Sequence, residues 1–112
     1  MFTLSELGTR WPSGDFREIA ILPIDEKAVS DAFDAPLHRG DETGLGPWAA
    51  LGMWHSSGIL IELICYQYMP PPNGFIVCVD SSSDFSKALE SLLPVFNLQR
   101  DQLPWISELV GP

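Results

Sequence analysis

Residues 59–80 read ILIELICYQYMPPPNGFIVCVD, two apolar runs on either side of a proline-rich turn. The first run, residues 59–68, is apolar on both of its alternating faces for most of its length. This pattern is typical of a central strand that is covered on both sides. Residues 74–80 form a second run of the same kind. The stretch therefore predicts an antiparallel hairpin at the centre of a small sheet.

The two cysteines of the chain, Cys65 and Cys78, both fall inside this hairpin. Two thiols are too few for a disulfide framework or for a tetrahedral metal site. The surrounding residues favour two buried, reduced thiols that pack as small apolar side chains. In a symmetric hairpin the two would lie opposite each other, and a one-residue bulge would separate them.

The neighbouring segments alternate between strand and helix patterns. Asp25 suits a helix N-cap, and Val29, Ala32 and Phe33 recur at helical spacing after it. A second helix follows the serine-rich segment 81–84, which offers several N-cap candidates. In chain order we expect a strand at 16–24, a helix at 25–35, strands at 48–55, 59–68 and 74–80, a helix at 81–93 and a short helix from residue 100.

Two segments carry no regular pattern. Residues 37–47 (LHRGDETGLGP) contain three glycines and an acidic pair, which predicts a long loop. Residues 1–14 are ambiguous between a short strand and a turn of helix. The expected fold is α+β, with a small antiparallel sheet of about four strands in β-α-β-β-β-α-α order, packed against helices. At 112 residues the chain is expected to be one domain, 1–112.

The charge is strongly negative for a chain with so many apolar residues. Asp and Glu number 15 against six Lys and Arg, a formal net charge of −9, while 46% of residues are hydrophobic. The apolar content argues against a disordered acidic tail, and the acidity argues against nucleic acid as a direct partner. Without a signal-peptide pattern or an apolar run of about 20 residues, a cytoplasmic protein that contacts no membrane is expected. Repulsion between like charges favours a monomer or a weak dimer.

No motif in the chain specifies a reaction, and we expect no enzyme, cofactor or metal. Glu62 lies in the most apolar strand, where burial would raise its pKa and suit acid–base work together with His55. The alternative is a Glu62 that points outward or pairs with Arg17 or Arg39. Five candidate metal ligands lie within twelve residues, but their spacing matches no EF-hand loop: Asp31, Asp34, His38, Asp41 and Glu42.

The densest acidic stretch is residues 25–42, with six acids and two bases. A solvated helix face and loop account for such a stretch, and so does a docking surface that attracts a basic partner. Trp48 follows the acidic segment, and tryptophan is enriched among the residues that dominate binding energy at interfaces. The predicted partner-binding residues are Asp31, Asp34, Asp41, Glu42 and Trp48.

In size, acidity and α+β pattern the whole chain resembles bacterial immunity proteins, which neutralise a cognate toxin. No sequence motif carries this resemblance. It implies a basic protein partner, a toxin domain such as a nuclease, whose active site the acidic surface would cover. Two other classes stay open: an acidic mimic of nucleic acid that inhibits a defence nuclease, and a small ligand-binding or enzymatic domain that uses Glu62 and His55.

Overall fold

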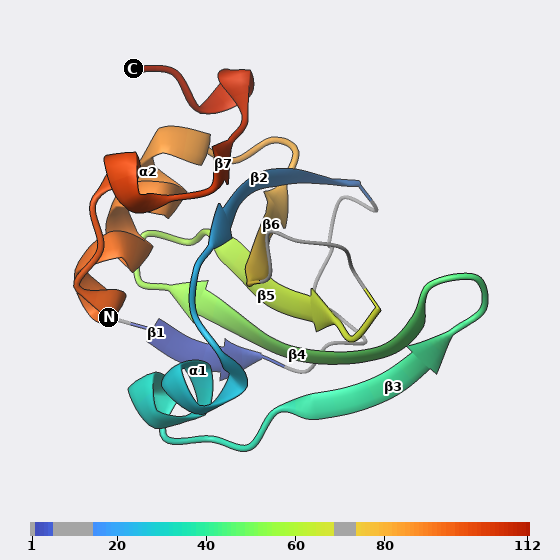
Figure 1. The fold of residues 1–112 in the computed structure, drawn as a ribbon. Helices are drawn as coiled ribbons and strands as arrows, with labels where there is room; N and C mark the ends of the chain where they lie inside the picture. The colour runs from blue at the N-terminus through green and yellow to red at the C-terminus, as the bar shows by residue number, and fades with distance from the viewer. Residues whose placement is uncertain (1, 6–14, 69–73) are drawn as a thin grey trace.

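A single curled sheet of antiparallel strands dominates the computed structural model, which describes residues 2–5, 15–68 and 74–112 (Figure 1). Within these residues the sheet has seven strands: β1 Phe2–Ser5, β2 Phe16–Leu22, β3 His38–Glu42, β4 Gly46–His55, β5 Leu60–Tyr66, β6 Phe75–Asp80 and β7 Trp105–Ile106. The helices are α1 Glu26–Phe33 and α2 Phe85–Leu92, with short 3-10 turns η2 Leu93–Phe96, η3 Arg100–Gln102 and η4 Glu108–Val110.

The strands follow the order β1-β4-β5-β6-β2-β7, and β3 also pairs with β4. One edge of β4 is shared: its residues 46–50 pair with β3, and its residues 52–55 pair with β1. The other edge of β4 pairs with β5 along residues 48–54. The long β4 therefore carries a two-stranded extension, which we call the β3–β4 arm (residues 38–50).

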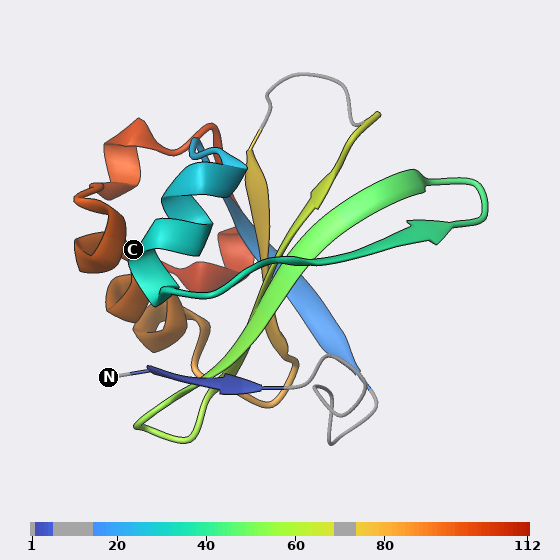
Figure 2. The same ribbon diagram turned by 90° about the horizontal axis from the view of Figure 1, so that it is seen from below.

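The helices and 3-10 turns of the described chain lie together on one face of the sheet (Figure 2). Both helices begin at the aspartates that suit them: Asp25 accepts a hydrogen bond from the Ala28 amide at 2.9 Å, and Asp84 accepts one from the Lys87 amide at 3.1 Å. The apolar side chains between the two layers form the main core, because every second residue of each strand points to this face. Its members include Ile19, Leu22, Val29, Leu51, Met53, Ile61, Leu63, Phe75, Val77, Val79, Leu89 and Leu92.

The pairing of β5 with β6 sets which side chains reach each face. Ile64 lies opposite Ile76, and Glu62 lies opposite Cys78. A symmetric hairpin with the two cysteines opposite each other is therefore wrong. Cys65 packs against the main core, whereas Cys78 belongs to a separate apolar cluster on the second face of the sheet, so the two thiols form no disulfide with each other. Burial raises the pKa of the Cys65 thiol, which keeps it protonated at neutral pH.

The expected fold class, about four strands in β-α-β-β-β-α-α order, is wrong, because the described residues are mostly sheet and form seven strands. Strands were expected near the positions of β2, β4, β5 and β6. The segment 37–47, expected as a loop, contains β3 and the start of β4. The helix expected from residue 100 is replaced by η3, β7 and η4. Residues 2–5 form β1, and the rest of the ambiguous N-terminal segment, together with Trp11, lies outside the described residues.

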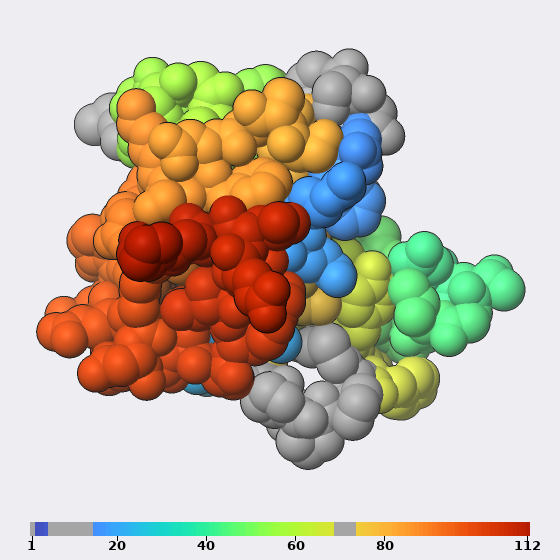
Figure 3. Space-filling view, turned by 90° about the horizontal axis from the view of Figure 1, so that it is seen from above, coloured from blue at the N-terminus to red at the C-terminus, as the bar shows by residue number. Residues whose placement is uncertain are grey.

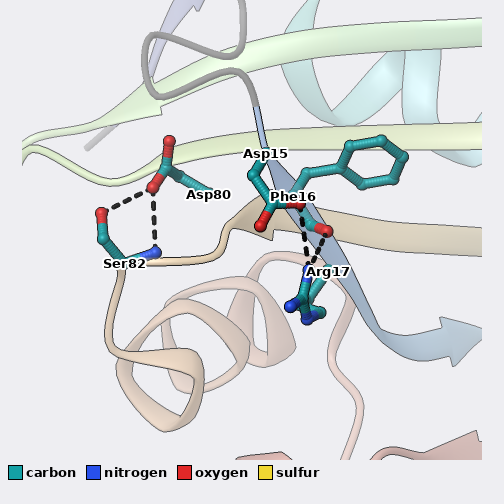
Figure 4. A network of polar contacts seen from close by, with 5 residues as sticks. All are labelled: Asp15, Phe16, Arg17, Asp80 and Ser82. Carbon is teal, nitrogen blue, oxygen red and sulfur yellow. Dashed lines mark hydrogen bonds and ion pairs between the residues drawn. The ribbon is translucent and has the colours of Figure 1, made fainter.

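The exit from β6 toward α2 is held by a compact polar turn (Figure 4). Asp80, only 7% exposed, accepts hydrogen bonds from the Ser82 amide at 2.9 Å and the Ser82 hydroxyl at 2.6 Å. Phe16 of the adjacent strand β2 is paired with Asp80. The next residue, Arg17, donates a hydrogen bond to Asp15 at 3.0 Å. These acids are engaged in local structure.

We predict that Leu63→Ala lowers the free energy of unfolding by about 3 kcal/mol, because it leaves a cavity in the main core. Leu63 is fully buried between Leu51 and Val77 of the neighbouring strands. Chemical denaturation measures the change. As a control, Leu45→Ala removes the same atoms from a side chain that is 51% exposed and should change stability by no more than about 0.5 kcal/mol. Equal losses in the two variants would contradict the central position of β5.

Candidate functional site

The second face of the sheet, opposite the helices, carries a smaller apolar cluster. Its buried members are Ala50, Ile64, Ile76 and Cys78, with Ile21, Trp48 and Tyr66 packed against them. No helix of the described residues lies on this face (Figure 2). Apolar side chains that reach the surface of such a face are available to another molecule.

A concave hollow of about 680 Å³ opens on this face. Its volume lies within the range of sites that bind small molecules or peptide segments. We call it the aromatic hollow, because three of its walls are aromatic rings. Its lining combines Tyr66 and Ile76 from the middle of the sheet, Glu18, Ile21 and Trp105 from the β2–β7 side, and Leu45, Gly46 and Tyr68 from the side of the β3–β4 arm.

The curl of the sheet brings these side chains together. In the strand order β2 and the β3–β4 arm lie on opposite sides of β5, yet residues from both line the same hollow. Figure 3 shows the turn of the arm projecting from the side of the molecule beside the end of β5. The hollow is therefore bounded by two separate parts of the sheet.

A glycine turn at the tip of the arm fixes one aromatic wall. Gly44 and Gly46 have φ values of 87° and 82°, a conformation that favours glycine. A Cβ atom at Gly46 would lie 2.6 Å from the Tyr68 ring. The absence of a side chain at Gly46 thus lets the Tyr68 ring pack directly on the turn.

The polar groups of the hollow are acidic or neutral. The Tyr66 hydroxyl donates to Glu42 Oε2 at 3.3 Å, so the carboxylate of Glu42, the last residue of β3, lies next to the Tyr66 wall of the hollow. Desolvation, with the nearby Glu42 carboxylate, raises the pKa of Tyr66 to about 12. The phenol therefore stays protonated at neutral pH and remains a hydrogen-bond donor to Glu42. Glu18 adds an exposed carboxylate on the opposite side.

The predicted partner-binding residues fall into two groups. Asp41, Glu42 and Trp48 all lie on the β3–β4 arm. Trp48 is half-buried, and its ring lies across the backbone of Gly40, where a Cβ atom would be 2.3 Å from the ring. Trp48 therefore has a packing role in the arm. Asp41 and Glu42 are exposed and take part in no ion pair within the described residues.

Asp31 and Asp34 lie on α1, apart from this group. Asp31 pairs with Lys27 one helical turn away. Asp34 ends the helix in a left-handed conformation, with φ 50° and ψ 50°. A further ion pair joins α1 to the arm, between Glu26 and Arg39. The acidic stretch 25–42 is thus divided between a helix whose charges are partly paired and an arm whose last two acids make no ion pair among the residues that the structure describes.

Glu62 and His55 leave the sheet on opposite faces. Glu62, 3% exposed, pairs with Gly52 of β4 and so belongs to the second face. His55, three residues farther along β4, packs its ring at 5.0 Å from Phe2, and its Nδ1 lies 2.6 Å from the Ser57 hydroxyl. Partial burial lowers the pKa of His55. One site cannot use both side chains as an acid–base pair.

The described residues also bear on metal binding and on membrane-spanning helices. Across residues 2–5, 15–68 and 74–112, no three His, Cys, Asp or Glu side chains gather closely enough to hold a metal ion. Among the same residues, no helix has the length and apolar character needed to cross a membrane.

Sequence reasoning did not find the hollow itself. Tyr66 and Tyr68 are two residues apart at the end of the expected strand 59–68, so their shared face could be read from the alternation. Trp105 and Leu45 could not be assigned to the site from the sequence, because long-range strand pairing brings them there.

No protein-family model matches the chain, and neither does any curated protein or solved structure.

We predict that the phenol of Tyr66 ionises near pH 12. The chain has two tyrosines, so Tyr68→Phe leaves Tyr66 as the single phenol in an absorbance titration at alkaline pH. Glu42→Gln in this background should lower the pKa only in part, because desolvation is the larger cause. Ionisation near pH 10 in the single-tyrosine protein would contradict the described environment.

The same pKa shift has a consequence for stability. Above pH 10 the unfolded chain loses the Tyr66 proton while the folded chain keeps it until about pH 12. The stability of the protein should therefore fall as the pH rises across this window, and fall less in Tyr66→Phe.

We also predict that Arg100 holds the C-terminal segment that presents Trp105. Its guanidinium donates to Glu90 at 2.7 Å, to the Gly111 carbonyl at 2.7 Å and to the Ser86 hydroxyl at 3.1 Å. Arg100→Met should lower the free energy of unfolding by about 1–2 kcal/mol and speed hydrogen exchange after residue 100. Arg17→Met, which removes an exposed pair, is the control and should cost no more than about 0.5 kcal/mol. Equal effects would contradict the role of Arg100.

Proposed function

We propose that this chain is an acidic binding protein that neutralises a basic protein partner, as an immunity protein does when it covers the active site of a cognate bacterial toxin. One observation carries the proposal: exposed aromatic side chains line a hollow whose rim is acidic. Tyr68 is 70% exposed and Trp105 is 42% exposed. Exposed aromatic side chains of this kind suit a role in binding, because Tyr and Trp dominate the binding energy of many interfaces.

The charges support a basic partner. The hollow has Glu18 and Glu42 at its sides, and Asp41 precedes Glu42 on the arm. Four of the five basic residues that the structure describes are engaged in ion pairs with acids of the chain. The chain has a net charge of −9, and the electrostatic field of its excess acidic side chains attracts cationic surfaces and speeds their association.

In this proposal the β3–β4 arm and the aromatic hollow form one docking surface. Asp41 and Glu42 attract the partner, and Tyr66, Tyr68 and Trp105 contribute apolar contact area. Trp48 stabilises the arm from its half-buried position. Asp31 and Asp34, on α1, contribute only to the long-range field. Catalysis by the chain itself is not required, because covering the basic residues of a nuclease is sufficient to block its phosphate contacts.

The hollow also favours a second candidate, a module that binds a small apolar molecule. Its volume of about 680 Å³ and its mainly apolar lining fit such ligands. Weak dependence on salt would separate this function from the recognition of a basic protein.

The first step of the test is to identify the neighbouring gene: a large secreted protein encoded immediately upstream supplies its C-terminal domain as the candidate toxin, and a neighbour of any other kind counts against the proposal. Co-expression of the chain should restore growth, and association should slow as salt increases. We predict that Asp41→Asn with Glu42→Gln slows association about fivefold at low salt, without a change in thermal stability. The matched control, Asp31→Asn with Asp34→Asn, makes the same change in net charge and should alter the rate less than about twofold.

Two results would contradict this proposal. Equal slowing by both pairs of substitutions would mean that net charge, and not the arm, steers the partner. An unchanged rate in the first variant, with growth still restored, would place the interface on another surface.

A further inference from the structure

We infer that the aromatic hollow is the receptor for an arginine side chain of the partner, carried on an otherwise apolar loop. The inference rests on the proposed function and names the chemical group that its docking surface recognises. The hollow is larger than one side chain fills, so the residues beside the arginine contact its apolar lining. The arginine itself meets the aromatic rings and the carboxylates.

The aromatic walls suit a cation. Tyr66 at the end of β5, Tyr68 two residues beyond it and Trp105 of β7 line the same hollow. A cation over the face of such rings is attracted by their electron density, most strongly by Trp. The floor beside the rings is apolar, with Ile21 and Ile76. An apolar floor lowers the exposure of a bound cation to water and so strengthens its attraction to the rings.

The carboxylates suit a guanidinium better than an ammonium. Glu18 lines the hollow on the β2 side, and on the arm side Glu42 accepts a hydrogen bond from the hydroxyl of Tyr66, one of the aromatic walls. A guanidinium is planar, stacks on aromatic rings and presents several N–H donors in different directions. It can therefore face a ring and still donate toward carboxylates on either side, whereas an ammonium offers a smaller, more strongly hydrated charge.

The position of the hollow suits a group that arrives from outside. Leu45, 51% exposed at the tip of the arm, also lines the hollow, so an apolar neighbour of the arginine has a contact there. None of the described basic residues of the chain lines the hollow. Four of them are engaged elsewhere, as Arg17 is with Asp15 and Arg100 is with Glu90. The positive charge that complements the nearby carboxylates is therefore supplied by the partner.

The test titrates the protein with three blocked tripeptides, acetyl-Leu-X-Leu-amide, where X is arginine, citrulline or lysine. Citrulline has nearly the shape of arginine without its charge. Nuclear magnetic resonance follows the indole N–H of Trp105 and the rings of Tyr66 and Tyr68. We expect saturable shifts at these groups, with the arginine peptide bound about fivefold more tightly than the citrulline peptide and more tightly than the lysine peptide.

Variants locate the binding. Trp105→Leu and Tyr68→Leu should each weaken the arginine peptide and reduce its preference over citrulline. Tyr68 is 70% exposed, so its variant keeps the inference testable if the change at Trp105 disturbs β7. Glu18→Gln should reduce the preference as well. Trp54→Leu is the matched control: Trp54 is a half-exposed tryptophan outside the hollow and should leave binding unchanged.

Each outcome separates this inference from the function on which it rests. Equal binding of the arginine and citrulline peptides, or shifts confined to α1, would overturn the inference. If that happens while Asp41→Asn with Glu42→Gln still slows the basic partner, the proposed function stands and only the arginine receptor is lost. If the partner also fails to associate, the proposed function falls with it.

Discussion

The architecture depends on the burial of β5 and β6 on both faces at once. Leu63 and Val77 pack toward the helices, while Ile64 and Ile76 pack on the second face. Because side chains alternate strictly along a strand, a shift of one residue between β5 and β6 would exchange the two faces. The register thus fixes the main core, and it also decides that Tyr66 points to the second face, where the hollow lies.

The candidate site follows from this arrangement and from the curl of the sheet. The helices cover one face, so the second face is where the described sheet carries aromatic side chains to the surface. The arm and β7 then bring Leu45 and Trp105 to either side of Tyr66. Acidity adds specificity to this shape, because Glu18 and Glu42 stand at its sides. Neither the charge nor the hollow alone would favour a basic protein partner over other ligands.

The sequence predicted those helices and strands whose own residues carry the signal, such as an apolar run or a helix N-cap. The apolar run ILIELICY predicted β5, and Asp25 predicted the start of α1. The residues of β3, His38–Glu42, have no apolar alternation; pairing with β4 makes them a strand, and sequence alone carries no signal of that pairing. The two residues of β7 depend in the same way on β2. Of the predicted site residues, Asp41 and Glu42 lie on the arm beside the hollow. Asp31 and Asp34 belong to α1, which does not line the hollow, and the local sequence carries no signal of that separation.

Hydrogen exchange, followed with and without the proposed basic partner domain, maps the docking surface without any substitution. If the arm and the aromatic hollow form the docking surface, partner binding slows exchange in residues 38–48, at residues 66–68 and around Trp105, and leaves α2 unchanged. Protection confined to α1 and α2, with no change in the arm or beside the hollow, would contradict this location of the docking surface.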